Sequence, residues 1–362
     1  MELSQHARNV NSGFNRTSIY EWFGTGEQEF PLHEYEGIEV IEIISGMKNI
    51  DPVDTETEEQ ILYAKLLKAA ITGSDTEYRV TSSAKSLLNV VNRLDDQQGA
   101  SPLHYAALMG HYNIVIFLLD NGADANTWDR NNKVTPLICA SAFGHLEIVR
   151  ALVEDDADIN AGLDTGTSAL LWAARKGHTE VVAYLLKQKA NQNSAVMYSE
   201  TPIHSAVLGG YTEILKLLIG ANGKADLSMD LKNKITPLHI AASGEYPKSL
   251  ECCKLLLHEG KVQVNAVTSR GQTPLHIAGT SFDPYVVKLL ISNKAYVDAL
   301  DNEGRTPLFY FICDDKYALE CIQLLVNAKC NVNLKDKSGY TCPYGSFQRS
   351  CGSSRIAAVE WC

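Results

Sequence analysis

Short apolar stretches recur along most of the chain at the spacing of a helix. Ile114, Val115, Leu118 and Leu119 share one face of a helix, because residues three and four positions apart lie one above the other. Similar stretches return at regular intervals up to about residue 327. Each stretch predicts an amphipathic helix that buries its apolar stripe.

A shorter apolar segment precedes each of these helices and predicts a helix of its own. Ser101 stands before Pro102, and a hydroxyl residue before a proline is typical of a helix start, since the hydroxyl accepts a backbone N–H and proline has none to lose. Ala106 and Ala107 permit close packing, and Gly110 permits a left-handed turn at the helix end. The pattern therefore predicts helix–turn–helix units.

Seven such units follow one another, and they begin near residues 101, 135, 168, 201, 236, 273 and 306. The unit reads T-P-L-H-x-A-A, then G-H, then I-V-x-x-L-L, then G-A-D-x-N, and in this form the chain resembles the ankyrin-repeat family. The resemblance implies an all-α fold, a solenoid of stacked helix-turn-helix units with short β-hairpin loops. A single unit is too small to bury its own stripe, so stacking builds the core.

The repeats define the expected domain organisation. Residues 1–58 form an acidic segment that we expect to be partly disordered or docked, residues 59–95 a capping unit without the T-P-L-H motif, and residues 96–341 the repeats. The repeat that begins at Thr236 is longer than the others and carries Pro247, which predicts an exposed loop between its helices. In the repeat that begins at Thr306, "FYFICDDKY" replaces the usual motif and predicts altered packing.

The last residues continue the repeat phase and then lose it. Thr341 stands where an eighth unit would begin, but Cys342 takes the proline position and no apolar stripe follows. We interpret residues 342–362 as a truncated eighth repeat or a disordered tail. One hypothesis is that the chain is a truncated isoform that lacks a C-terminal effector domain.

Charge is concentrated in the first 60 residues, where 13 Asp/Glu and 3 Lys/Arg give −10 of the total of −11. No basic run or face is present, so we expect no nucleic-acid partner. No apolar stretch reaches the length of a membrane helix, so we expect no membrane insertion. The nine cysteines and the lack of a secretory signal favour free thiols in a reducing compartment, which indicates the cytoplasm, with the nucleus as an alternative.

The histidines and cysteines do not indicate catalysis, a cofactor or a metal site. Seven of the ten histidines belong to the T-P-L-H or G-H motifs, where the resemblance implies structural hydrogen bonds. Cys139, Cys252, Cys253 and Cys321 fall within predicted helices, where cysteine acts as a small apolar residue. The cysteines of the tail lack zinc spacing. We expect a protein that is not an enzyme and has no catalytic residue, cofactor or metal.

The resemblance implies a concave partner-binding face built from loop tips and first helices. Aromatic, methionine and arginine side chains are typical of interfaces, and the first three repeats are rich in them at the variable positions. The expected binding residues are Tyr105, Leu108, Met109, Trp128, Arg130, Phe143, Trp172, Arg175, Lys176 and Tyr198. An apolar anchor flanked by two cations is the expected centre of this face.

These observations favour an intracellular adaptor or scaffold, a monomer that binds a protein partner through its concave face. One alternative is a regulatory or inhibitory subunit that masks a partner's active site or targeting signal. A third is a microbial effector directed at a host protein. The motifs identify the scaffold and leave the partner open, because binding depends on the site rather than on the fold.

Overall fold

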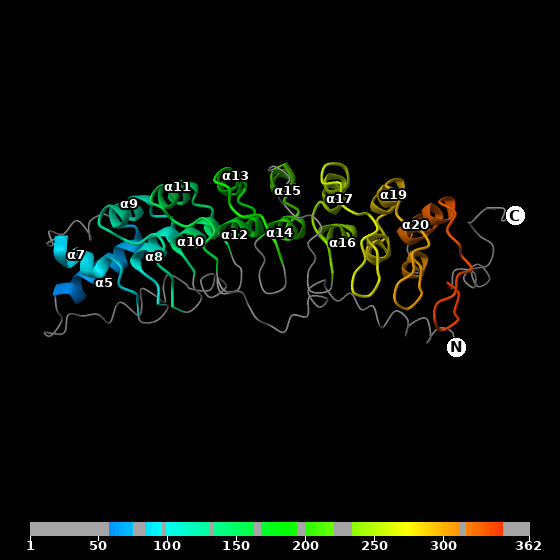
Figure 1. The fold of residues 1–362 in the computed structure, drawn as a ribbon, viewed down its shortest axis with the longest axis horizontal. Coiled ribbons are helices and arrows are strands. Elements are labelled where there is room, and N and C mark those ends of the chain that lie inside the picture. Colours follow the sequence, from blue (N-terminus) through cyan, green and yellow to red (C-terminus); the bar gives the residue numbers. More distant parts are fainter. Residues whose placement is uncertain are drawn as a thin grey trace. The chain divides into compact units, whose positions relative to one another are not determined.

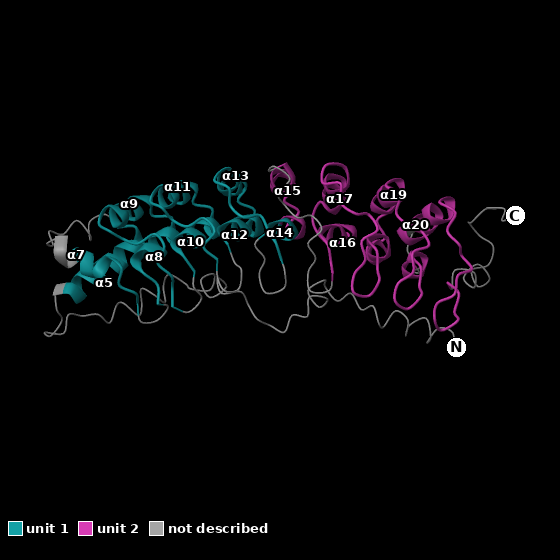
Figure 2. Cartoon of the chain, viewed as in Figure 1, with its two compact units in different colours: residues 1–205 teal, residues 206–362 magenta. Residues whose placement is uncertain are grey.

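The structure is a computed structural model that describes residues 58–74, 84–95, 99–130, 134–162, 168–193, 200–220, 234–311 and 316–342. Every regular element in these ranges is helical, and one isolated antiparallel bridge joins Lys335 to Thr341. This confirms the predicted all-α class. The expectations for residues 1–57 and 343–362 lie outside the described residues. The chain divides into two compact units, residues 1–205 and 206–362 (Figure 2).

Unit 1 arranges its helix pairs in two rows (Figure 1). The first helices of successive repeats pack side by side in one row, and the second helices form the other. Ahead of the first repeat, α5 packs against α7 and α8, in the range where the sequence predicts a capping unit. The helices are α5 (Glu58–Thr72), α7 (Ala84–Val91), α8 (Pro102–Met109), α9 (Tyr112–Asp120), α10 (Pro136–Phe143), α11 (Leu146–Glu154), α12 (Ala169–Lys176), α13 (Thr179–Lys187) and α14 (Pro202–Leu208), which ends in unit 2.

Unit 2 is also built from helix pairs, with shorter first helices. Pro247 is exposed in the connection between α16 and α17, as predicted. The repeat from Thr306 begins with a 3₁₀ turn in place of an α-helix, and its buried Phe311 ring lies 6.4 Å from that of Phe282 in the preceding repeat. The elements are α15 (Thr212–Gly220), α16 (Pro237–Ala242), α17 (Ser249–His258), α18 (Pro274–Ile277), η1 (Ala278–Thr280), α19 (Pro284–Ser292), η2 (Pro307–Tyr310) and α20 (Lys316–Asn327).

The predicted stripes form the core of the stacked repeats. Ile114, Val115 and Leu118 are at most 1% exposed, as are Ala106 and Ala107 on the first helix. Leu119 departs from the expectation, because it is half-buried and faces the space between α9 and α11.

The first helices start in one of two ways, with or without the histidine of the T-P-L-H motif. Thr135 accepts the N–H of Ile138 (3.3 Å) through its hydroxyl, as predicted. Ser101 departs from this pattern, because its hydroxyl lies 2.8 Å from Nδ1 of His104 and its N–H donates to the same nitrogen (3.1 Å). Since Nδ1 accepts, Nε2 carries the proton and donates to the carbonyl of Val134 in the next repeat (2.9 Å). The histidine thus links two repeats.

In the first three repeats, the histidine of the G-H motif ties the repeat to the unit before it. His178 donates from Nε2 to the carbonyl of Ala142 (2.9 Å), and its ring covers Gly144 so closely that a Cβ there would lie 2.5 Å from Nδ1. Gly144 also has φ +79°, in the left-handed region. This glycine is therefore required twice, for its backbone conformation and for the space that the neighbouring imidazole occupies.

Asparagine side chains join the segments that follow the second helices of neighbouring repeats. Asn126 accepts the N–H of Asp158 (2.7 Å) and donates to the carbonyl of Asp156 (3.1 Å). Asn92, at the end of the capping helices, makes the same two bonds to Asp124 and Gly122. The last letter of the G-A-D-x-N motif therefore holds the register between units.

Candidate functional site

The buried histidines and cysteines serve the repeat structure. Burial lowers the pKa of His104 and, to about 4, that of His239, so both imidazoles are neutral at pH 7. Burial raises the pKa of Cys139 and Cys253 well above the usual range, which leaves these thiols protonated and unreactive. No group of three or more His, Cys, Asp or Glu side chains that could hold a metal ion occurs in the described ranges.

Three of the residues expected on the partner-binding face are buried. Tyr105, Leu108 and Trp172 are 3, 4 and 3% exposed, which corrects the expectation that they are open to a partner. Neighbouring first helices pack so closely that the side chain after the T-P-L-H histidine is enclosed. Tyr105 donates from its hydroxyl to Oδ2 of Asp95 (3.0 Å), which also accepts the N–H of Ala100 (2.8 Å), so it braces the loop before α8.

The side chains at the ends of the first helices remain accessible. Met109, Phe143 and Lys176 each stand eight residues after the first position of their repeat and end α8, α10 and α12. These three helices lie side by side (Figure 1). Phe143 is 39% exposed, Met109 is half-buried and Lys176 is exposed. We call Met109, Phe143 and Lys176, together with Arg175, the first-helix face.

Two cations surround the buried indole at one side of this face. Cζ of Arg175 lies 5.5 Å from the centroid of Trp172, and Nζ of Lys176 lies 5.9 Å from it. Arg175 also faces Glu200, with 3.9 Å between Nη1 and Oε2. The expected anchor with two cations is present, but its aromatic part is covered, and Phe143 offers the accessible ring. Sequence reasoning missed Glu200, which lies 25 residues from its partner.

The loop before α10 carries two further predicted residues. Trp128 is 57% exposed and Arg130 is also exposed. The N–H of Arg130 donates to the carbonyl of Gly99 in the preceding loop (3.2 Å), and Asp129 accepts the N–H of Val134 (2.7 Å). These bonds hold Asp129 and Arg130 in place while Trp128 and Arg130 stay exposed. Tyr198 lies outside the described residues.

Comparison with known proteins agrees with this architecture. A family model for ankyrin repeats in three copies matches residues 67–162, 156–230 and 223–301, and a single-repeat model matches residues 303–337. Together these matches cover well over half of the chain. The chain belongs to the ankyrin-repeat family. Ankyrin repeats bind other proteins, and the family is generally a non-enzymatic interaction fold, so the chain is a protein–protein interaction module.

Individual ankyrin relatives match parts of the chain. Human Rabankyrin-5 is 34% identical over 89 residues, which is 24% of this chain and 7% of the relative. The mouse B-cell lymphoma 3 protein homolog is 30% identical over 125 residues, 34% of this chain and 27% of the relative. The crystal structure of the human ASB11 ankyrin repeat domain is 26% identical with a TM-score of 0.55, and covers 64% of this chain and 99% of that domain. The chain spans less than a third of the length of either curated relative.

No helix in the described ranges has both the length and the apolar character needed to cross a membrane.

Proposed function

We propose that this chain is an intracellular adaptor or scaffold, a monomer that binds a protein partner through the first-helix face and the neighbouring loop tip. The observation that supports this most strongly is the row of accessible side chains on α8, α10 and α12. Phe143 supplies an accessible aromatic ring between Met109 and the cations Arg175 and Lys176. Aromatic, methionine and arginine side chains are enriched at protein interfaces.

The chemistry of this face favours a partner segment with an apolar side chain next to a carboxylate. The apolar side chain would cover Phe143, and the carboxylate would pair with Arg175 or Lys176. Glu200 already faces Arg175 at 3.9 Å, which shows that a carboxylate fits there. Buried thiols at Cys139, Cys252 and Cys253 are compatible with a reducing compartment.

The test compares affinity capture from lysates by wild-type protein and by the double variant Phe143→Ala/Lys176→Glu, with quantitative mass spectrometry. Glu180→Gln on α13 serves as a control, because Glu180 is exposed on the other row. We expect the face variant to lose the proteins that the wild type and the control both capture. Identical captured sets for all three proteins would contradict the proposal.

An adaptor differs from an inhibitory subunit in the number of proteins that it holds at once. Size-exclusion chromatography of the captured complex with light scattering measures this number. A complex with two different partners supports the adaptor. A one-to-one complex in which the partner's activity is blocked supports the inhibitory alternative.

A further inference from the structure

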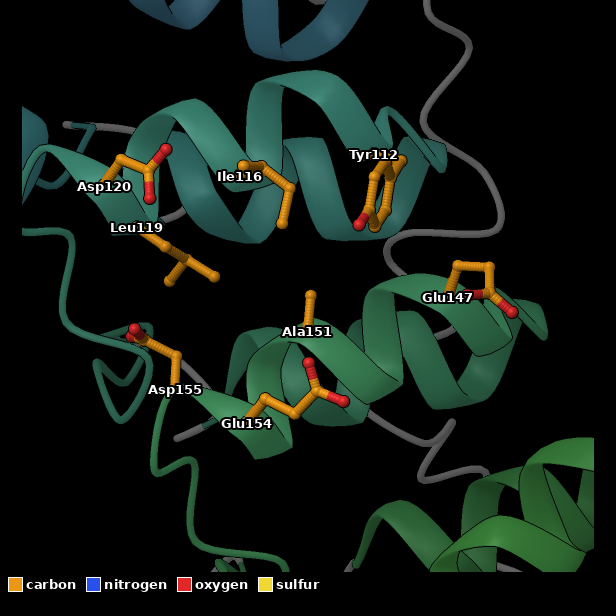
Figure 3. A pocket seen from close by; sticks show the side chains of 8 residues that line it. All are labelled: Tyr112, Ile116, Leu119, Asp120, Glu147, Ala151, Glu154 and Asp155. Atoms are coloured by element: carbon orange, nitrogen blue, oxygen red, sulfur yellow. The ribbon is translucent and has the colours of Figure 1, made fainter.

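A groove runs between the second helices of the first two repeats, on the row opposite the first-helix face. It has a volume of about 200 Å³ (Figure 3). Its apolar lining is formed by Ile116, Leu119 and Ala151, and Glu154 lies beside Ala151. Tyr112, which is 45% exposed, lies at one end near Glu147. Asp120 and Asp155 lie at the other end.

The groove exists because of one small residue. Ala151 stands sixteen residues after Thr135, and the corresponding residue of the next repeat is Tyr184, sixteen after Ser168. Between α11 and α13, Arg150 lies over the ring of Tyr184, with 5.2 Å from Cζ to the centroid. Between α9 and α11, the corresponding pair is Ile116 and Ala151. The chain thus fills one junction with its own arginine and tyrosine and leaves the preceding one hollow.

Carboxylates stand at both ends of the groove. Glu147 marks the end with Tyr112, and Asp120 and Asp155 mark the other (Figure 3). Among the described residues, Glu147 is the one member of this rim with a salt bridge, to Arg150 at 3.7 Å. Partial burial and then the neighbouring carboxylates of Asp156 and Asp120 raise the pKa of Asp155. A cation placed here would relieve that repulsion.

The size and the ligand set narrow the class of occupant. A volume of about 200 Å³ is below the roughly 300–1,000 Å³ of a small-molecule site and suits one or two protein side chains. The rim carboxylates are not among any group that could hold a metal ion, since the described part of the chain contains no such group. At the next junction, between α11 and α13, Arg150 lies between the carboxylate of Glu147 and the ring of Tyr184. By analogy, an arginine side chain suits the groove, which also offers a ring and carboxylates.

We propose that the groove between α9 and α11 binds an extended segment of another protein with the pattern basic–x–apolar–x–basic. In an extended segment, alternate side chains point to one face. The outer two of three such side chains lie about 13 Å apart, at roughly 3.3 Å per residue. From Tyr112 to Asp120, α9 rises about 12 Å, at 1.5 Å per residue. The two basic groups therefore reach the two acidic ends while the apolar side chain rests on Ala151.

The test measures fluorescence anisotropy of a labelled peptide, Gly-Ser-Arg-Ser-Leu-Ser-Arg-Ser-Gly, with the full chain. The control peptide replaces both arginines with glutamate. We expect the arginine peptide to bind with a Kd below about 1 mM, more weakly as salt rises, because part of the attraction is between exposed charges. Failure to bind at that concentration, or equal binding of the control peptide, overturns the proposal.

Two variants locate the binding. Ala151→Tyr copies the residue of the next repeat and fills the groove, and we expect at least tenfold weaker binding. Asp120→Asn/Asp155→Asn keeps the shape, and we expect weaker binding with a flatter salt dependence. Glu180→Gln, at the position on α13 that Glu147 holds on α11, should change Kd less than twofold. Circular dichroism and thermal melting check that each variant is folded.

If both groove variants bind the peptide as the wild type does, the proposal is wrong. If only Ala151→Tyr has melted, the charge variant decides. This test is independent of the first-helix face, because a failed peptide titration leaves the capture experiment with Phe143→Ala/Lys176→Glu unaffected.

Discussion

The buried imidazole of His239 predicts a loss of stability in mild acid. His239 is 1% exposed, its Nδ1 accepts the N–H of Thr236 (3.2 Å), and its Nε2 lies 3.0 Å from the carbonyl of Gln272 in the next repeat. Protonation of Nδ1 would place a proton against a donor in a site that excludes water. Burial accordingly lowers the pKa of His239 from 6.5 to about 4.

The sign and size of the effect follow from that shift. Between pH 6.5 and pH 4, the unfolded chain binds a proton at this imidazole and the folded chain does not. The contribution of this neutral imidazole to the free energy of unfolding is therefore complete above about pH 6.5 and is lost as the pH falls. At pH 5 the loss from this single group is about 2 kcal/mol, and it approaches about 3 kcal/mol near pH 4. His104 and His276, whose pKa values burial also lowers, add in the same direction.

Chemical denaturation followed by circular dichroism at pH 7, 6 and 5 measures this loss. His239→Gln is less stable at pH 7, but it should lose about 2 kcal/mol less than the wild type between pH 7 and pH 5. His258→Gln, at the exposed end of α17, should lose as much as the wild type. If His239→Gln shows the same loss as the wild type, the buried neutral imidazole is not the cause.

Two substitutions test the links between repeats and a third tests the strain at one turn, all by the free energy of unfolding. Gly144→Ala should cost about 2–3 kcal/mol, because its Cβ would meet the His178 ring at 2.5 Å and because φ at this position is positive. Gly220→Ala, whose Cβ would have no atom within 4 Å, should not destabilise the fold, and equal effects of the two substitutions would contradict this reasoning. Lys294→Gly should stabilise the fold by about 1 kcal/mol, because this lysine has φ +67°, which glycine adopts without strain. Lys288→Gly within α19 should destabilise it by a similar amount, and a loss of stability in Lys294→Gly would show that the lysine is not strained. Asn126→Ala should cost about 1–2 kcal/mol, since two hydrogen bonds to the next repeat are lost. A similar loss of stability in the exposed Asn113→Ala would contradict a specific role of Asn126 between the repeats.

Much of the fold could be predicted from single repeats, because its causes are local. The hydroxyl–proline starts, the glycine ends and the apolar stripes each act within about ten residues. The links between repeats were harder to predict. The contact between His178 and Gly144 joins residues 34 apart, and no pattern within one unit reveals that the glycine must also make room for an imidazole.

The candidate surfaces were less predictable, because exposure depends on the neighbouring repeat. Tyr105 and Trp172 occupy positions that vary between repeats, which suggested contact with a partner, yet adjacent first helices enclose them. Phe143 stands four residues after the position of its own repeat that corresponds to Tyr105, and it stays accessible. The groove at Ala151 depends on the pair of residues that face each other between neighbouring second helices. It becomes visible only when the pair Ile116 and Ala151 is compared with the corresponding pair Arg150 and Tyr184.

The most direct test of the proposed function is a footprint of the captured partner on this chain. Hydrogen–deuterium exchange with mass spectrometry compares the free chain with the complex, peptide by peptide. We predict protection at the ends of α8, α10 and α12, around Met109, Phe143 and Lys176, and in the loop that carries Trp128. Protection confined to unit 2, with no change in these segments, would contradict the account.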